Sequence, residues 1–182
     1  MKTPKHAMID IETLACSYDS VILTIGGVKF NPFDAAEPYE PLNIKLEIDD
    51  QLERGRKKDP DTIKWWGSLP QKVRDEAFSV GDRVSVEDGL THLNTWIGDC
   101  QKVWSQGPSF DMPILGSLYK EFGMKQNWMF WDERDSRTIT ALLNRDFKKS
   151  LKFDAHSAVA DCIAQAQCVQ ESFRVNNLTF MI

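Results

Sequence analysis

Two carboxylates, Asp10 and Glu12, stand one residue apart in the otherwise apolar segment 8–13 near the start of the chain. The small and apolar residues around them predict a β-strand, in which side chains alternate between the two faces of a sheet. Asp10 and Glu12 therefore point the same way and repel each other unless a metal ion, a proton or a basic partner neutralises them. A pair of this kind alone is more often a solvated strand end than a functional site, so other residues are needed to show whether Asp10 and Glu12 form one.

Size and composition are those of one soluble globular domain. The chain has 182 residues, of which 42% are hydrophobic and 27% are charged, and we expect a single domain over residues 1–182. The net charge of −5 argues against a protein that grips nucleic acid through a broad basic surface. It does not exclude a nuclease, because acids that bind divalent metals contribute to the negative count.

The four cysteines form no C-x-x-C pair, which predicts reduced thiols, no zinc site and a cytoplasmic location. The N-terminal residues run straight into the first predicted strand, so we expect no signal peptide. No apolar run approaches the roughly 20 residues that a membrane-spanning helix needs, so we expect no membrane association.

The order of the predicted elements indicates an α/β fold. Three strands over 7–12, 21–30 and 39–48 follow one another through short connections, which predicts an antiparallel meander. The pair Gly26-Gly27 predicts a bulge or a close backbone approach, and the polar segment 51–61 predicts a loop. The other elements are strands at 102–105 and 128–131 and helices at 61–66, 70–78, 85–98, 111–122, 136–144 and 157–174. We expect a five-stranded mixed sheet, the meander plus two parallel strands, flanked by helices.

Two more acids and a histidine stand where such elements begin or end. Asp111 follows the strand at 102–105 and opens a helix, at an end of the sheet where α/β folds tend to place their sites. Asp161 lies one turn into the last helix, and His156, a candidate general base near neutral pH, precedes it by five residues. Each also has an ordinary explanation: a helix-dipole contact for Asp111, a surface position for Asp161 and a capping position for His156.

Taken together, these residues resemble the DEDDh class of 3′–5′ exonucleases. The matching segments are 9–13 with Asp10 and Glu12, 104–111 with Asp111, and 156–161 with His156 and Asp161. Segments 62–66 and 135–138 resemble one branch, the phage DexA-like and mycobacterial exoribonuclease-like proteins. The resemblance covers residues 7–173 and implies a ribonuclease H-like fold, which agrees with the element order. Many relatives carry Asn a few residues before the second Asp, where this chain has Gln106-Gly107-Pro108.

The resemblance implies a two-metal mechanism. Asp10, Glu12, Asp111 and Asp161 would hold two Mg²⁺ or Mn²⁺ ions that stabilise the attacking and leaving oxygens of an in-line displacement. His156 would deprotonate the attacking water. The product would be a nucleoside 5′-monophosphate released from the 3′ end.

Further residues are candidates for substrate contact. They are the backbone positions Ile11, Thr13 and Leu14, the aromatic residues Trp65 and Phe110, and the basic residues Arg137, Lys149 and Lys152. Aromatic rings can stack on bases and basic side chains can contact phosphates. The alternatives remain core packing for the aromatic residues, a solvated loop for the lysines and a pair with Asp135 for Arg137.

The leading functional interpretation is a metal-dependent 3′–5′ exonuclease acting on single-stranded 3′ ends, with DNA slightly favoured over RNA. An exoribonuclease that trims RNA 3′ overhangs is the alternative within this class. A non-catalytic nucleic-acid-binding module and an endonuclease of the same fold are the rivals from outside it. The apolar tail 178–182 packs either on its own domain or on a partner subunit, and we expect a homodimer.

Overall fold

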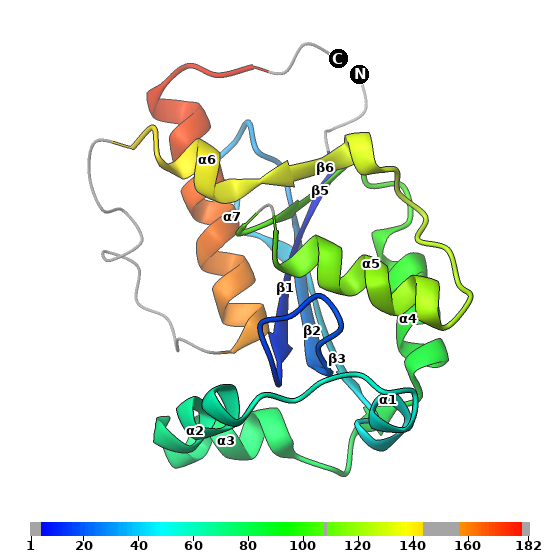
Figure 1. Cartoon of the computed structure of the whole chain (residues 1–182). Coiled ribbons are helices and arrows are strands. Elements are labelled where there is room, and N and C mark those ends of the chain that lie inside the picture. Colours follow the sequence, from blue (N-terminus) through cyan, green and yellow to red (C-terminus); the bar gives the residue numbers. More distant parts are fainter. Residues whose placement is uncertain (1–4, 108, 144–156, 180–182) are drawn as a thin grey trace.

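The computed structural model describes residues 5–107, 109–143 and 157–179, and it contains one mixed sheet with helices on both sides (Figure 1). The sheet has the strand order β4-β3-β2-β1-β5-β6, which places the strand carrying Asp10 and Glu12 in its interior. Strands β1 (His6–Thr13), β2 (Ile22–Phe30) and β3 (Tyr39–Leu46) form the expected antiparallel meander. Strands β5 (Lys102–Ser105) and β6 (Glu133–Asp135) continue the sheet in parallel beyond β1.

The strand count differs from the prediction. A sixth strand, β4 (Arg83–Val84), pairs in parallel with β3, and its two residues carry too little pattern to be predicted. The predicted strand at 128–131 is wrong. Trp128 is buried against Tyr119, residues Phe130–Asp132 form a 3₁₀ helix (η1), and only Glu133–Asp135 pair with β5. The aromatic run has high strand propensity, but burial of one ring decides its conformation.

Seven α-helices are present in the described ranges. They are α1 (Asp49–Glu53), α2 (Pro60–Ser68), α3 (Gln71–Phe78), α4 (Val86–Ile97), α5 (Asp111–Glu121), α6 (Ser136–Thr140) and α7 (Ala158–Val175). The capping signals are confirmed for α4, because Ser85 Oγ accepts from the Asp88 N–H and Gly98 ends the helix with a φ of 53°. Helix α1 was not predicted, because a loop was expected from residue 51. None of the helices just named is long and apolar enough to cross a membrane.

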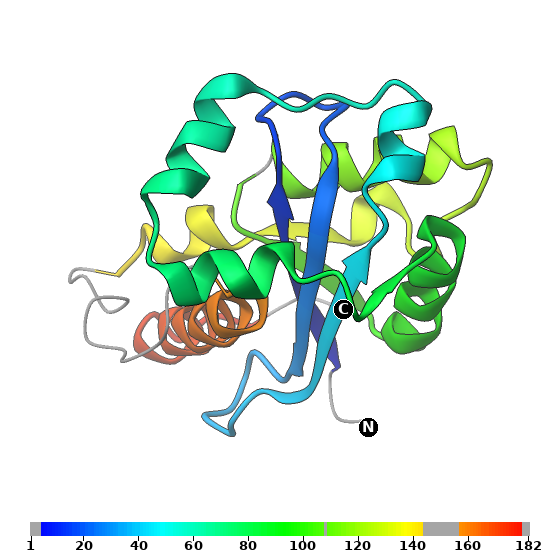
Figure 2. The ribbon, with the colours of Figure 1, turned by 90° about the horizontal axis from the view of Figure 1, so that it is seen from below.

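The two faces of β1 pack against different helices. Ala7, Ile9 and Ile11 belong to a core cluster shared with α4 and α5. Met8 lies in a second cluster with Trp104 and the apolar face of α7. Helix α7 accordingly lies on one side of the strands and α4 and α5 lie on the other (Figure 1 and Figure 2). Because side chains alternate along a strand, Asp10 and Glu12 share the face of Met8 and point toward α7.

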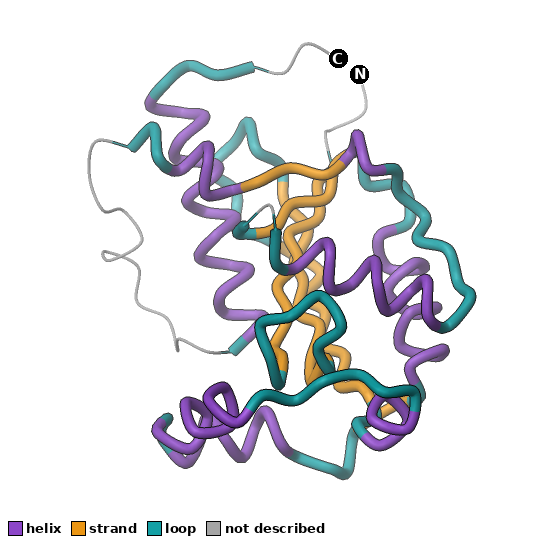
Figure 3. Tube along the Cα trace, in the orientation of Figure 1, coloured by secondary structure: helices purple, strands orange, loops and turns teal. Residues whose placement is uncertain are grey.

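Two loops lie side by side beyond the end of β1 (Figure 3). The Val21 N–H donates to the Lys57 carbonyl at 2.9 Å, and the Asp59 N–H donates to the Leu14 carbonyl at 2.8 Å. Arg56, in the basic segment 54–58, is only 3% exposed and its Nη1 donates to Glu121 on α5 at 2.9 Å. The basic segment therefore holds Arg56 as a structural anchor, and the loop pair places α2 next to the end of β1.

Candidate active site

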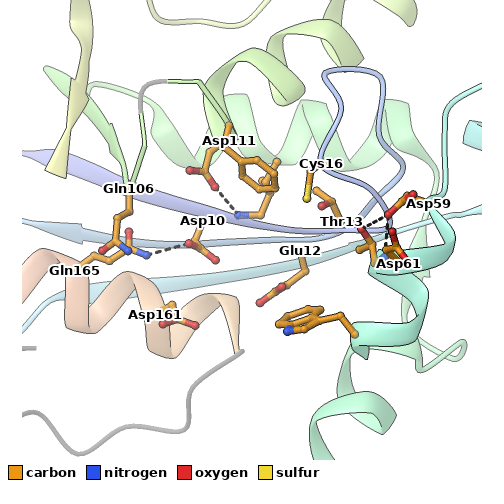
Figure 4. Close-up of a pocket in the computed structure, with 14 residues that line it drawn as sticks. Asp10, Glu12, Thr13, Cys16, Asp59, Asp61, Gln106, Asp111, Asp161 and Gln165 are labelled. Carbon is orange, nitrogen blue, oxygen red and sulfur yellow. Dashed lines mark hydrogen bonds between the residues drawn. The ribbon is translucent and has the colours of Figure 1, made fainter. Parts of the chain in front are cut away.

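Three acids that are distant in sequence meet where β1 faces the first turns of α7. Asp10, Glu12 and Asp161 each offer a carboxylate oxygen, and these oxygens all lie within 4.8 Å of one another. Figure 4 shows the two strand acids pointing toward the helix that carries Asp161. The three carboxylates converge because strand alternation turns Asp10 and Glu12 toward α7 and because Asp161 lies one turn into that helix.

Asp111 approaches the same pocket from the first residue of α5. Its side chain is 3% exposed, and its Oδ1 accepts a hydrogen bond from the Ile11 backbone N–H at 3.3 Å. Gly107, with a φ of 140°, belongs to the turn between β5 and α5 and adopts a backbone conformation that favours glycine. Asp111 therefore faces the pocket with the other acids, although it is not one of the three whose oxygens lie within 4.8 Å.

Burial raises the pKa of two of these acids, Glu12 and Asp111. Burial, reinforced by the charges of Asp10, Asp161 and Asp111, raises the pKa of Glu12 to about 9. Burial also raises the pKa of Asp111 to about 6, against the opposing effects of the Ile11 N–H and the Arg137 charge. The cluster is therefore costly to ionise completely unless positive charge enters the pocket.

The donor set fits hard divalent cations. The converging side chains provide only carboxylate oxygens, which are the ligands that Mg²⁺, Mn²⁺ and Ca²⁺ prefer. A cation would offset both the burial and the neighbouring negative charges that raise the pKa of Glu12. The residues available to hold it are Asp10, Glu12 and Asp161, with Asp111 across the same pocket.

The pocket around these acids has a volume of about 600 Å³. Of the residues predicted to contact substrate, Ile11, Thr13, Trp65 and Phe110 line it. Leu14 does not: it is buried in a separate core cluster, and its N–H already donates to the Val21 carbonyl at 3.0 Å. Phe110 is half-buried and Trp65 is 43% exposed, so two aromatic rings border the pocket without being sealed in the core.

Arg137 lies beside the loop that leads to Asp111. Its backbone N–H donates to Asp135, which caps α6, and its guanidinium Nη2 donates to the Gln106 carbonyl at 3.2 Å. The side chain therefore contacts the loop backbone rather than the Asp135 carboxylate. His156, Lys149 and Lys152 lie outside the described residues.

Several lining residues were not predicted from the sequence. They are Cys16, Asp59, Asp61, Thr62, Gln106 and Gln165. Gln165 follows Asp161 by four residues, and this helical spacing was the available signal. Asp59 begins α2 by accepting from the Thr62 N–H at 2.9 Å, and an acid directly before Pro60 was the available signal for this N-cap.

Comparisons with known proteins find exonucleases. The sequence model of the Rv2179c-like 3′–5′ exoribonuclease domain matches residues 5–173. An exodeoxyribonuclease of Enterobacteria phage T4 is 29% identical over 188 residues, which cover 85% of this chain and 83% of that protein.

Solved exonucleases share the fold at low sequence identity. Exonuclease X in complex with 5′-overhanging duplex DNA has a TM-score of 0.59 at 16% identity, covering 96% of this chain and 94% of that one. The nuclease domain of 3′hExo, a DEDDh family member bound to rAMP, has a TM-score of 0.60 at 15% identity, covering 96% and 94%. E. coli exonuclease I with a dT13 oligonucleotide has a TM-score of 0.68 at 12% identity, covering 96% of this chain and 43% of that one. The expected ribonuclease H-like fold is confirmed.

Proposed function

The chain belongs to the family of Rv2179c-like 3′–5′ exoribonuclease domains and is a 3′–5′ exonuclease; from this premise we propose its substrate, products and catalytic residues. It removes nucleotides from the 3′ ends of single-stranded nucleic acid, with DNA as the first candidate, and releases nucleoside 5′-monophosphates. The observation that carries the proposal is the convergence of Asp10, Glu12 and Asp161, with Asp111 across the same pocket.

The proposed reaction depends on divalent cations, which the carboxylates of the pocket would hold. Two Mg²⁺ or Mn²⁺ ions, when bound, would supply the charge that stabilises the attacking and leaving oxygens of an in-line phosphodiester displacement. Strand β1 and helix α7 hold the carboxylates in place, so little reorganisation is needed when the scissile phosphate enters. His156 takes the proton from the attacking water, as the resemblance to DEDDh exonucleases implies.

The aromatic border of the pocket supports binding of an unpaired terminal base. Phe110 precedes Asp111 directly, and Trp65 comes from α2 on the same pocket. Base stacking on aromatic rings contributes about 1–3 kcal/mol per base and tolerates any sequence. We assign Ile11 and Thr13, which line the pocket, to the same nucleotide, with the Ile11 N–H already donated to Asp111. We assign Arg137, Lys149 and Lys152 to neighbouring phosphates.

RNA is the second candidate substrate, and a specific observation favours it. The matching family is described as an exoribonuclease domain, whereas the phage T4 relative is an exodeoxyribonuclease. The discriminating contact is one that accepts or excludes the 2′-hydroxyl of the terminal sugar. Matched DNA and RNA oligonucleotides of one sequence separate the two candidates directly.

The proposal is tested with 3′-labelled single-stranded DNA and RNA in the presence of Mg²⁺ or Mn²⁺. Metal-dependent release of labelled nucleoside monophosphate is expected, and Asp10→Ala should abolish it. Release that survives Asp10→Ala would show that the activity belongs to another site or to a contaminant. Cleavage of a circular single strand, which has no 3′ end, would show that the protein is an endonuclease.

The role of His156 has its own test. His156→Ala should lower the rate by about 10²–10⁴-fold while Mn²⁺ binding stays nearly intact, because a general base acts on the proton transfer. Loss of Mn²⁺ binding as well would indicate that His156 is a ligand.

Two further expectations accompany the proposal. We propose a single domain over residues 1–182 that forms a homodimer, which light scattering after size-exclusion chromatography would test. The four cysteines, all within the described ranges, form no disulfide, which supports a cytoplasmic location.

A further inference from the structure

Gln165 connects the strand and the helix that carry the acids. It follows Asp161 by one turn of α7, so both side chains project from the same side of the helix. Its Nε2 donates a hydrogen bond to Oδ1 of Asp10 at 2.9 Å, as Figure 4 shows. The side chain lines the pocket and is 2% exposed, so the contact lies inside the site rather than at its surface.

The other polar atom of this amide lacks a partner. Oε1 of Gln165 is buried and accepts no hydrogen bond from the residues that the structure describes. An unpaired buried acceptor is destabilising because it has lost its hydrogen bonds to water. When a cation is bound and the acids are ionised, the carboxylates of Asp10, Glu12 and Asp161 only accept hydrogen bonds, so they cannot supply the missing donor. A water molecule bound to a cation can, because its hydrogens point away from the ion.

We propose that Gln165 is a positioning residue for the cation site, an inference that rests on the function proposed above. Its Nε2 holds the Asp10 carboxylate in the orientation that would bind the cation, and its Oε1 would accept a hydrogen bond from a water on that cation. An ionised carboxylate has about four acceptor sites, so the bond from Gln165 leaves others for the ion. In this role Gln165 acts through Asp10.

Outer hydrogen-bond partners of this kind orient metal ligands, and their removal typically weakens metal affinity by about 10–100-fold. Gln165→Met tests the role because methionine keeps the length and much of the volume of glutamine but cannot donate. Gln165→Asn is a second test, since its amide is one methylene too short to reach Asp10. The second variant keeps the proposal testable if the first does not fold.

The same helix offers a matched control. Gln170 is also a buried amide, 6% exposed, and its Nε2 donates to the carbonyls of Asn31 and Ala36 at 3.0 and 2.9 Å. These bonds tie α7 to the loop after β2 and do not involve the acids. Gln170→Met therefore removes a comparable buried hydrogen-bonding group without touching the pocket.

The experiment measures Mn²⁺ binding by isothermal titration calorimetry and the melting temperature of the metal-free proteins. Gln165→Met and Gln165→Asn are expected to raise the Mn²⁺ dissociation constant at least tenfold. Gln170→Met should lower the melting temperature but leave the dissociation constant within twofold of the unmodified protein.

Three outcomes would overturn the inference, and they distinguish failure of the Gln165 role from failure of the proposed function. Unchanged Mn²⁺ affinity in a folded Gln165 variant, or equal weakening in Gln170→Met, would reduce Gln165 to a packing residue while the proposed function stands. If the unmodified protein does not bind Mn²⁺, the proposed function fails, and the role of Gln165 fails with it.

Discussion

Gly26 on β2 lies directly against Ala158 at the start of α7. A Cβ atom at Gly26 would lie 2.5 Å from the carbonyl carbon and from the Cβ of Ala158. Gly26 is also the register partner of Asp10 across the antiparallel β1–β2 pair. The absence of a side chain at Gly26 therefore sets the distance between α7 and the sheet at the level of the acids.

Replacement of Gly26 by alanine should disturb both the fold and the site. The added methyl group must push α7 outward, because the atoms that it meets belong mainly to backbone, and overpacking of this kind typically costs about 1–3 kcal/mol. Since Asp161 moves with α7, Gly26→Ala should also weaken Mn²⁺ binding. Urea unfolding and calorimetry measure the two effects.

Gly67 provides the control for this prediction. It lies inside α2, and no atom comes within 4 Å of a Cβ built there. Gly67→Ala should be neutral or stabilising by up to about 1 kcal/mol, because alanine favours the helix. A Gly26→Ala protein as stable as Gly67→Ala, with normal Mn²⁺ affinity, would show that α7 is not held at its position by this contact.

The raised pKa of Glu12 predicts an unusual pH dependence of the metal-free protein. The value in the fold is about 9, above the ordinary value of 4.5, so the folded state holds a proton that the unfolded state releases. The contribution of Glu12 to the free energy of unfolding is therefore complete below pH 4.5. It falls as the pH rises toward 9, by at most about 1.4 kcal/mol per pH unit. Glu12→Gln should flatten this part of the curve, as measured by urea unfolding in chelator.

Mn²⁺ should narrow the difference in stability between these two proteins. A cation that binds only the folded state adds about 2.7 kcal/mol at one hundred times its dissociation constant. At pH 8 we expect Glu12→Gln to be the more stable protein in chelator and the unmodified protein to gain more from Mn²⁺. Equal gains in melting temperature would exclude Glu12 from the ligand set.

Burial of His6, away from the acid cluster, should make the protein less stable in acid. It is 3% exposed, and its Nδ1 accepts a hydrogen bond from Trp104 Nε1 at 2.9 Å. Burial, with the charges of Lys102 and Arg134, lowers its pKa from 6.5 to about 4. The folded state thus favours neutral His6. The contribution of His6 to the free energy of unfolding is complete above pH 6.5 and is lost as the pH falls toward 4, by on the order of 2–3 kcal/mol.

His6→Asn should remove this loss, because the asparagine oxygen can accept the Trp104 hydrogen bond without titrating. The exposed His92 is the control, and His92→Asn should leave the acid transition where it is. Urea unfolding between pH 4 and 7 makes the comparison. If His6→Asn keeps the full acid sensitivity, other groups cause it.

Trp65→Ala should weaken substrate binding more than it affects the fold. The ring borders the pocket, is 43% exposed, and packs edge-to-face with its neighbour Trp66, with centroids 5.0 Å apart. Loss of one base-stacking contact of about 1–3 kcal/mol predicts a rise in KM of roughly 5–150-fold. Trp131, 56% exposed and not among the residues lining the pocket, is the control, and Trp131→Ala should leave KM unchanged. Equal KM values for both variants would remove Trp65 from the binding site.

Much of the local structure was predictable because it depends on neighbours in the chain. Alternation along β1 placed Asp10 and Glu12 on one face, and the Ser85 cap and Gly98 marked the ends of α4. The strand predicted at 128–131 was wrong because strand propensity depends on neighbours in the chain, whereas the burial of Trp128 against Tyr119 is a tertiary contact.

The order of residues alone indicates which elements hold the acidic side chains and on which face of β1 two of them lie, because strand alternation and helix periodicity orient a side chain relative to its own element. The approach of Asp161 to Asp10, the place of Asp111 at the same pocket and the hydrogen bond from Gln165 to Asp10 arise only when the elements pack together. The distance between elements depends on how closely α7 can pack on the sheet, and that closeness depends on Gly26.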